Sequence, residues 1–145
     1  MKITSFRGPH RFLSNFYTGY PITYEGIKYP TSEHAYQAAK TLDINKRQQI
    51  RDCKTPGDAK RAKPSWLEIR PDWEEVKYQI MVDILTLKFK HPLLREWLKN
   101  TGTVILEEGT HWHDNIWGNC LCPKCETIPG QNLLGIALMK VRSNL

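Results

Sequence analysis

The sequence predicts an α+β fold that is mainly α-helical, with a small β component, in one compact domain over residues 1–145. The length is that of one domain and is sufficient to bury a hydrophobic core. Two segments, 72–90 and 132–142, carry apolar residues at the spacing of a buried helix face. Strand signals are short by comparison, and they lie at 3–6, 21–24, 27–29 and 104–106.

The first helix is predicted over 31–40, after a proline. A hydroxyl side chain at Thr31 or Ser32 can cap it, and three alanines follow. The helix dipole favours the ionised form of Glu33 in the first turn, so we interpret this residue as an anionic ligand or base. A solvated polar face is the alternative interpretation. At helical spacing one face carries a carboxylate, a phenol or amide, and an ammonium, namely Glu33, Tyr36 or Gln37, and Lys40.

Turn and capping signals predict the smaller elements. A Glu-Gly pair at 25–26 between two strand segments indicates a two-residue hairpin. The polar segment 45–53 is predicted to be helical. Thr55, followed by a proline, indicates the start of a short helix that ends near 63–64. Another helix is predicted over 92–100.

The strongest helix signal covers 72–90, where Asp72 and Glu75 resemble a capping box. Lys77 projects into the middle of the apolar face. Because burying an unpaired ammonium is costly, we expect Lys77 to face a pocket or a carboxylate, with snorkelling as the alternative. Lys88 lies on the same side near the helix end, where snorkelling is easier. The apolar face consists of Trp73, Val76, Ile80, Met81, Ile84, Leu85 and Leu87.

The chain is basic, with a net charge of +6. This charge predicts an anionic partner, either a phosphorylated small molecule or nucleic acid, although a basic solvated surface gives the same pattern. The cations concentrate in a basic segment, 40–63, which contains Lys40, Lys46, Arg47, Arg51, Lys54, Lys60, Arg61 and Lys63.

Several classes of protein do not fit the sequence. No apolar run approaches the roughly 20 residues of a membrane span, and the first residues lack the apolar core of a signal peptide. We therefore expect a cytoplasmic protein without membrane association. The sequence contains no glycine-rich phosphate loop, no HExxH and no GxSxG, which argues against P-loop nucleotide hydrolysis. It leaves the oligomeric state open.

The segment 107–130 shows no helical periodicity, and a loop of this length in a compact domain is usually functional. Asp114 precedes Trp117 by three residues, and a glycine follows the tryptophan. Such an arrangement can hold a flat base or a sugar against the indole while the carboxylate points at it. Packing of Trp117 in the core is the alternative.

Three cysteines, Cys120, Cys122 and Cys125, have C-x-C-x-x-C spacing. Their clustering favours reduced thiols or a metal over a disulfide framework, and it matches part of a tetrahedral structural zinc site. Redox-active thiols and simple thiols are the alternatives. The candidate fourth ligands are His111, His113 and Cys53.

Asn15 lies between two phenylalanines in FLSNFY, where it can form a turn or place a polar group in an apolar pocket, and it is a candidate substrate-binding residue. This motif and five others resemble the NADAR family, whose bacterial members include YbiA-like proteins. The resemblance extends from about residue 5 to residue 143, and the C-x-C-x-x-C insert departs from many relatives. In chain order the motifs are FLSNFY (12–17), YPTSEHAYQAAK (29–40), DWEEVKYQIM (72–81), KFKHPLLREWLKNTG (88–102), HDNIWG (113–118) and GQNLLGIALMKVR (130–142).

The resemblance implies a compact, mainly helical NADAR-like fold and an N-glycosidase that breaks the bond between a ribose and an amine or base. It implies two groups of substrate: phosphoribosylated pyrimidine intermediates of riboflavin synthesis, and ADP-ribose attached to guanine, including guanine in DNA. By motif match it implies functional roles for Glu33, Trp73, Asp114 and Trp117, and Lys77 also lies in a matching motif.

These residues suit cleavage of a ribosyl C–N bond without a cofactor. Oxocarbenium-like charge develops at C1′, and Glu33 or Asp114 can stabilise it. Alternatively Lys77, with Lys40 as the second choice, forms an imine with the ring-opened sugar. The two tryptophans would stack the base or exclude water, and the basic segment would hold phosphates.

Two hypotheses from other classes remain. One is a non-enzymatic module that binds ADP-ribose or nucleic acid through the same residues; tight binding without product would identify it. The other is a zinc-stabilised protein-interaction domain, in which loss of the metal unfolds the chain.

Overall fold

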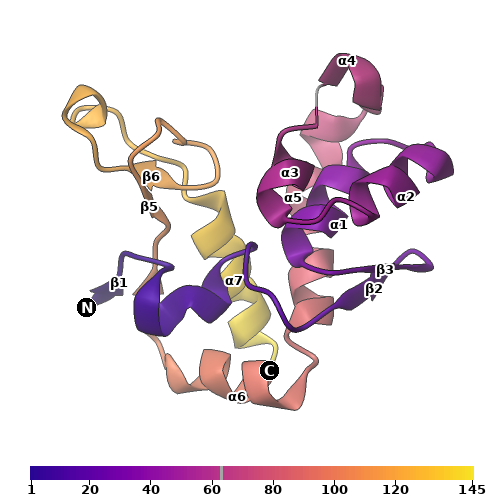
Figure 1. Cartoon of the computed structure of the whole chain (residues 1–145). Helices are drawn as coiled ribbons and strands as arrows, with labels where there is room; N and C mark the ends of the chain where they lie inside the picture. The colour runs from indigo at the N-terminus through magenta and orange to yellow at the C-terminus, as the bar shows by residue number, and fades with distance from the viewer. Residues whose placement is uncertain (63) are drawn as a thin grey trace. The chain divides into compact units, whose positions relative to one another are not determined.

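A computed structural model describes residues 1–62 and 64–145. Contacts within the chain divide it into two compact units, one formed by Asn15–His91 and the other by Met1–Ser14 together with Pro92–Leu145. Seven α-helices and six short strands among the described residues confirm the mainly helical α+β fold (Figure 1). The single domain over 1–145 stays a prediction.

The unit Asn15–His91 contains an antiparallel hairpin of β2 (Ile22–Tyr24) and β3 (Ile27–Tyr29). The two residues between the strands, Glu25 and Gly26, have φ angles of 47° and 85°. Positive φ at both central positions is the signature of a type I′ turn, which confirms the hairpin predicted at 25–26.

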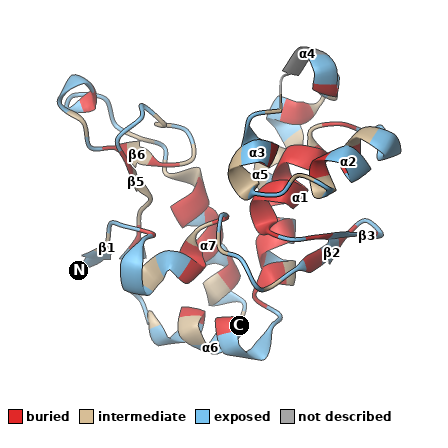
Figure 2. Cartoon of the chain, in the orientation of Figure 1, coloured by how far each residue is buried: buried red, intermediate tan, exposed pale blue. Residues whose placement is uncertain are grey.

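Helix α1 (Ser32–Ala39) is the centre of this unit. It contacts α2 (Ile44–Arg51), α3 (Pro56–Lys60) and α5 (Trp73–Lys88). All eight of its residues are buried, as Figure 2 shows in red. The interpretation of its polar face as solvated is therefore wrong. A short helix, α4 (Pro64–Leu67), precedes α5.

The hydroxyl caps are confirmed at two helix starts. The side chains of Thr31 and Thr55 accept hydrogen bonds from backbone N–H groups three residues later. The capping box at the start of α5 is wrong, because the Asp72 carboxylate binds the Arg70 guanidinium at 2.6 and 3.0 Å instead. Helix α3 ends at Lys60; the position 63 at which its end was expected lies outside the described residues.

The predicted apolar face of α5 is largely confirmed. Five of its seven residues are buried, whereas Val76 and Leu87 are partly exposed. The buried five are Trp73, Ile80, Met81, Ile84 and Leu85.

The other unit joins the two ends of the chain. Strand β1 (Lys2–Ile3) pairs in parallel with β4 (Ile105–Leu106). Along the chain, two further elements of this unit lie between these strands: a 3-10 helix, η1 (Gly8–Leu13), and α6 (Pro92–Asn100). Helix α7 (Leu133–Ser143) packs on β4. The strands and α-helices of this unit lie close to their predicted positions, whereas η1 is not among the elements predicted from the sequence.

Helix α7 approaches β4 through a glycine. A Cβ atom added at Gly135 would lie 2.1 Å from the backbone oxygen of Leu106. Asn132, which precedes α7 with φ of 52°, donates its side-chain amide to the same oxygen at 2.9 Å and accepts from Glu108 N at 3.0 Å. The polar and glycine positions of the GQNLLG motif therefore attach the helix to the strand.

The segment 107–130 is not the structureless loop that the sequence predicts. It contains β5 (Gly109–Thr110) and β6 (Asn119–Cys120), which pair in parallel, and a 3-10 turn, η2 (Pro123–Cys125). These elements are two or three residues long, so hydrophobic periodicity does not reveal them. Across the described residues, no helix combines the length and apolar character that a membrane span requires.

Candidate active site and cysteine cluster

The start of α1 is held by a network of buried polar groups. Asn15 is 8% exposed, and its backbone oxygen accepts from Glu33 N at 3.0 Å. Its side-chain oxygen accepts from Ser32 Oγ at 3.2 Å, and its amide nitrogen lies 3.5 Å from Met81 Sδ. Both interpretations of Asn15 therefore hold: it lies in a turn and it also places a polar group in the interior.

The predicted polar face of α1 lies inside the protein. Glu33, Tyr36 and Gln37 are 7%, 6% and 4% exposed, whereas Lys40 at the helix end is half-buried. Among the described residues no group donates a hydrogen bond to Gln37 Oε1, although this atom is buried. Leaving a buried amide oxygen without a hydrogen-bond donor is costly, so we expect a water molecule or a ligand to donate a hydrogen bond to it.

Helix α5 supplies an aromatic neighbour to this face. The rings of Tyr36 and Trp73 lie 5.2 Å apart at 56°, and Lys40 Nζ lies 5.5 Å from the Tyr36 ring centre. Burial lowers the pKa of Lys40; the charge of Glu33 opposes the shift, and the charge of Lys77 adds to it. Glu33 and Lys77 are thus each within electrostatic reach of Lys40.

Lys77 has the carboxylate partner that its position on the apolar face predicts. Its ammonium donates to Glu74 one turn earlier, while 16% of its side chain is exposed. The partner, Glu74, lies on the same helix, and its side chain is 80% exposed. The ammonium is thus paired at an exposed carboxylate while most of the side chain is buried, an arrangement that also agrees with the snorkelling alternative.

The snorkelling predicted for Lys88 is wrong. Lys88 is only 4% exposed, and burial lowers its pKa to about 7. Its Nζ lies 5.2 Å from the ring centre of Phe89. Helical spacing places Lys88 on the buried side of α5, and this position decides its burial although the residue lies near the helix end.

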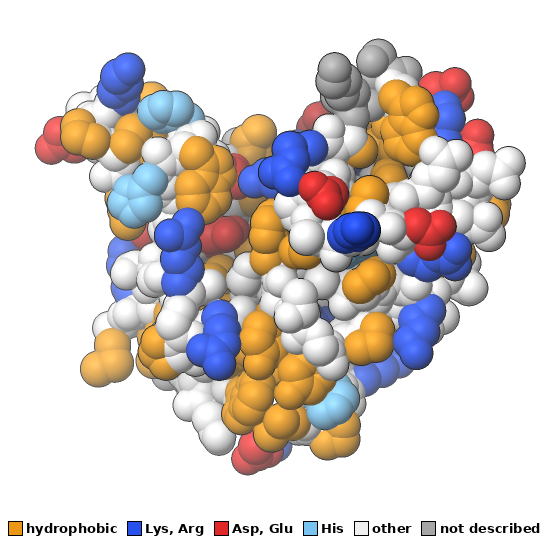
Figure 3. All heavy atoms as spheres, viewed as in Figure 1, with side chains coloured by type: hydrophobic (Ala, Val, Ile, Leu, Met, Phe, Trp, Pro, Cys, Tyr) orange, Lys and Arg blue, Asp and Glu red, His pale blue; other side chains and the backbone are white. Residues whose placement is uncertain are grey.

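Carboxylates neutralise much of the basic segment. Arg47 is almost fully buried and donates to Glu25 at 3.1 Å and to the backbone oxygen of Thr41 at 2.8 Å. Lys and Arg side chains are scattered over the face shown in Figure 3. Four of the eight cations in the segment 40–63 are thus paired with carboxylates; anion binding by this segment stays a prediction, and Lys63 lies outside the described residues. The ion pairs within the segment are Lys46–Glu68, Arg47–Glu25, Arg51–Asp52 and Arg61–Asp58.

Asp114 and Trp117 belong to the other unit. Asp114 Oδ1 accepts from the backbone N–H groups of Ile116 and Trp117 at 3.1 and 2.9 Å, so the carboxylate closes the turn that presents the indole. Backbone oxygens of residues 115–118 accept from the N–H groups of residues 131–134. The DNIWG motif is thereby fastened to the start of α7, and the Trp117 side chain is half-buried.

The three clustered cysteines meet one histidine. The potential ligand atoms of His113, Cys120, Cys122 and Cys125 all lie within 4.8 Å of one another, and this group could hold a metal ion. Cys53 belongs to the other unit, where its thiol donates to Gln49 O at 3.6 Å. Of the three candidate fourth ligands, the structure therefore selects His113.

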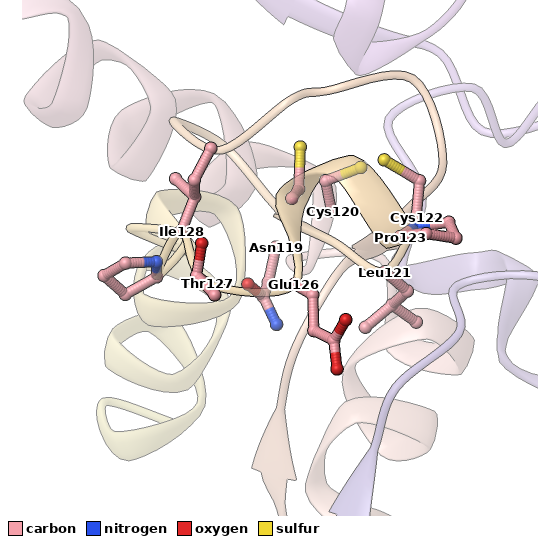
Figure 4. Close-up of a pocket in the computed structure, with 10 residues that line it drawn as sticks. Asn119, Cys120, Leu121, Cys122, Pro123, Glu126, Thr127 and Ile128 are labelled. Atoms are coloured by element: carbon pink, nitrogen blue, oxygen red, sulfur yellow. The ribbon is translucent and has the colours of Figure 1, made fainter.

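A cavity of about 660 Å³ adjoins this cluster and is lined by residues of the segment 119–129. Figure 4 shows the sulfur atoms of Cys120 and Cys122 pointing toward one another, while Leu121 and Glu126 point away from them. The cysteine sulfurs thus gather on one side of the turn.

Comparison with known proteins identifies the family. The family model of the NADAR domain matches residues 4–145. The chain belongs to the NADAR family. The N-glycosidase YbiA of Escherichia coli (strain K12) is 39% identical over 139 residues, an alignment that covers 92% of this chain and 80% of the relative.

Two further NADAR relatives are informative. The NMR structure of E. coli YbiA matches 99% of this chain and 83% of that chain, with a TM-score of 0.79 and 35% identity. A riboflavin biosynthesis protein of Vibrio vulnificus is 33% identical over 138 residues, which cover 94% of this chain but 36% of that protein. With N-glycosidases among its NADAR relatives, this chain is an enzyme of the N-glycosidase class.

Proposed function

We propose that this NADAR protein hydrolyses the C–N bond between C1′ of a phosphorylated ribose and an amine or base. The observation that carries the proposal is the buried carboxylate of Glu33 in the first turn of α1. It lies on the same helix face as Lys40, whose pKa it affects. Tyr36 lies on this face too, and its ring contacts the ring of Trp73. Such a site offers an anion, a cation and an aromatic surface together, which are the groups that a charged glycoside needs.

In this proposal Glu33 stabilises the positive charge that develops at C1′ as the bond to the leaving amine breaks. A partly desolvated carboxylate acts more strongly on that charge than one in water. Asp114 is the second proposed carboxylate. Because its Oδ1 already accepts two backbone N–H groups, Asp114 would serve with its remaining acceptor capacity and would also fix the orientation of Trp117.

The proposed binding residues divide by chemistry. Trp73 and Trp117 would stack on the base or exclude water. Lys40 would contact a phosphate by a charge-assisted hydrogen bond. Asn15 would act by holding the first turn of α1, because its side chain and backbone oxygens already bind Ser32 and Glu33.

A lysine imine is the alternative route within this function. A neutral amine would attack C1′ of the ring-opened sugar and displace the leaving amine, and water would then hydrolyse the imine. Lys77 is paired with Glu74, whereas burial lowers the pKa of Lys40. This contrast favours Lys40 over Lys77 as the nucleophile, if the imine route operates. Sodium borohydride added during turnover would trap the adduct, and Lys40→Arg or Lys77→Arg would abolish trapping at the residue responsible.

The proposed substrates are a phosphoribosylaminopyrimidine of riboflavin synthesis and ADP-ribosyl guanine in nucleic acid. The first is supported by the riboflavin biosynthesis protein among the relatives. The pairing within the basic segment offers little support for a broad nucleic-acid surface. We propose that the two units act as one domain, since the family model spans both, and that the cleavage step itself uses no cofactor.

Product analysis on both substrates tests the proposal. We expect ribose 5-phosphate from the pyrimidine substrate; release of ADP-ribose from modified DNA would instead assign the enzyme to nucleic acid. Glu33→Gln keeps the size of the side chain and should lower the rate by about 100-fold or more. Glu75→Gln, which alters an exposed carboxylate at the start of α5, is the matched control. Tight binding of either substrate without any product would refute the proposal and favour the hypothesis of a non-enzymatic binding module.

A further inference from the structure

We propose that His113, Cys120, Cys122 and Cys125 together bind one structural zinc ion, which holds the segment 107–130 in its folded form. The four residues belong to one unit of the chain, whereas Glu33 and Lys40 belong to the other. The proposal specifies all four ligands, the metal and its role.

The distances within the cluster fit a tetrahedral metal site. His113 Nδ1 lies 3.2 Å from Cys125 Sγ and 3.4 Å from Cys122 Sγ, and all four ligand atoms lie within 4.8 Å of one another. Around a zinc ion with bonds of about 2.1 Å to nitrogen and 2.3 Å to sulfur, tetrahedral geometry separates ligand atoms by roughly 3.5–3.8 Å. The ligands therefore need only small movements to enclose the metal.

The local backbone brings the cysteines together. Cys120 ends β6, Cys122 precedes η2, and Cys125 is the last residue of that 3-10 turn. Cys125 N donates to Cys122 O at 3.1 Å, which closes the C-x-x-C turn. His113 N donates to Cys120 Sγ at 3.3 Å, a contact that would also stabilise a thiolate bound to metal.

The backbone conformation of His113 is a second observation in favour of a metal ligand at this position. His113 has φ of 67°, in the left-handed region that non-glycine residues occupy infrequently. The residue is otherwise exposed, so core packing does not account for this conformation. A metal bond would compensate for the cost of holding it.

The donor set indicates the metal and its role. Three sulfurs and one imidazole nitrogen in a tetrahedron suit zinc, because soft thiolate ligands exclude magnesium and calcium. With all four positions taken by the protein, no coordination position remains for water or substrate. The site is therefore structural and not catalytic.

The position of His113 gives this zinc ion a further consequence, which rests on the proposed function. Asp114 follows His113 directly, and the strands of this segment are only two residues long. A metal that joins position 113 to positions 120–125 would fix the turn in which Asp114 orients Trp117. Loss of zinc should therefore disorder that turn even though the metal contacts no substrate.

Metal analysis of the purified chain of residues 1–145 is the direct test. We expect about one zinc per chain after expression in zinc-containing medium, and visible absorption of tetrahedral thiolate-bound cobalt when Co²⁺ replaces it. A folded chain that neither carries zinc nor takes it up on titration would overturn the proposal, as would stoichiometric iron in its place.

Matched variants test the ligand set. His113→Asn removes the ligand with a residue that tolerates a left-handed backbone, and it should weaken zinc binding by more than about 100-fold, the upper end for changes outside the ligand shell. His111→Asn and Cys53→Ser should retain the metal, whereas Cys125→Ser should lose it. Equal zinc affinity in His113→Asn and His111→Asn would refute the assignment of His113.

These readouts are independent of catalysis. Zinc content and the cobalt spectrum report on the metal site even if neither proposed glycoside is a substrate. Limited proteolysis within 107–130 should become faster in His113→Asn than in His111→Asn, and unchanged proteolysis would contradict the stabilising role. Conversely, a zinc-loaded protein without glycosidase activity would leave this inference intact and refute only the proposed function.

Discussion

The buried hydroxyl of Thr31 should be worth far more to stability than its size suggests. Its oxygen accepts from His34 N at 3.2 Å, which caps α1, and it lies 2.8 Å from His34 Nδ1. The other imidazole nitrogen lies 3.0 Å from the carbonyl oxygen of Cys53, so that nitrogen carries the proton and Nδ1 accepts from the Thr31 hydroxyl. Thr31 and His34 are 1% and 0% exposed, so water cannot replace these bonds without rearrangement.

Thr31→Val removes the hydroxyl and keeps the shape. Loss of an N-cap costs about 1 kcal/mol, and leaving the His34 nitrogen unpaired costs about 1–3 kcal/mol. We therefore expect the free energy of unfolding to fall by about 2–4 kcal/mol. With an m-value of about 2 kcal/mol/M, the urea midpoint should fall by about 1–2 M.

Urea denaturation followed by far-ultraviolet circular dichroism measures this change. Thr31→Ser is the control, because it keeps the hydroxyl and should cost only about 1 kcal/mol for the missing methyl group. A Thr31→Val protein as stable as the Thr31→Ser protein would refute the account of the cap and the imidazole.

Three further predictions concern other positions. Folding lowers the pKa of Lys88 from 10.5 to about 7. Burial of Lys88 therefore destabilises the protein fully below pH 7, and this destabilisation is lost as the pH rises toward 10.5, the pKa in the unfolded chain. Lys88→Met should raise the free energy of unfolding most at about pH 6, and the gain should shrink toward about pH 10. A pH-independent advantage in urea titrations would contradict this. Gly135→Ala should cost about 1–3 kcal/mol because its Cβ would meet Leu106 O at 2.1 Å, whereas Gly57→Ala, whose new Cβ would meet flexible side-chain atoms at 3.4 Å or more, should change the thermal midpoint little. Asp114→Asn keeps an oxygen acceptor for two backbone N–H groups and should retain thermal stability that Asp114→Ala loses; equal midpoints would show that these bonds contribute little.

The sequence predicts the helices well because their signals are local. Thr31 and Thr55 cap the helices that follow them, and the apolar face of α5 repeats at helical spacing. The capping box at Asp72 fails because a competing local partner, Arg70, binds the carboxylate. Such a choice depends on side-chain geometry, which sequence spacing does not contain.

The pairing of distant groups is what the sequence could not provide. Periodicity places Lys77 and Lys88 on one face of α5, but it does not reveal that the first pairs with Glu74 and the second is buried. Likewise, spacing identifies three cysteines but leaves three candidates for the fourth ligand, and the left-handed backbone at His113 distinguishes one of them only in three dimensions. The catalytic roles of Glu33 and Asp114 stay predictions.

The division of the chain also sets an order of events during synthesis. The unit Asn15–His91 is one uninterrupted stretch, so all of its contacts become available once residue 91 has left the ribosome. The other unit must wait, because Lys2 pairs with Ile105 and the start of α7 holds the DNIWG turn. The amino-terminal strand therefore remains without its partner while roughly 100 further residues are made, and the closure of such a long loop makes this the slower part of the protein to assemble. The proposed zinc segment thus belongs to the unit that assembles after Asn15–His91.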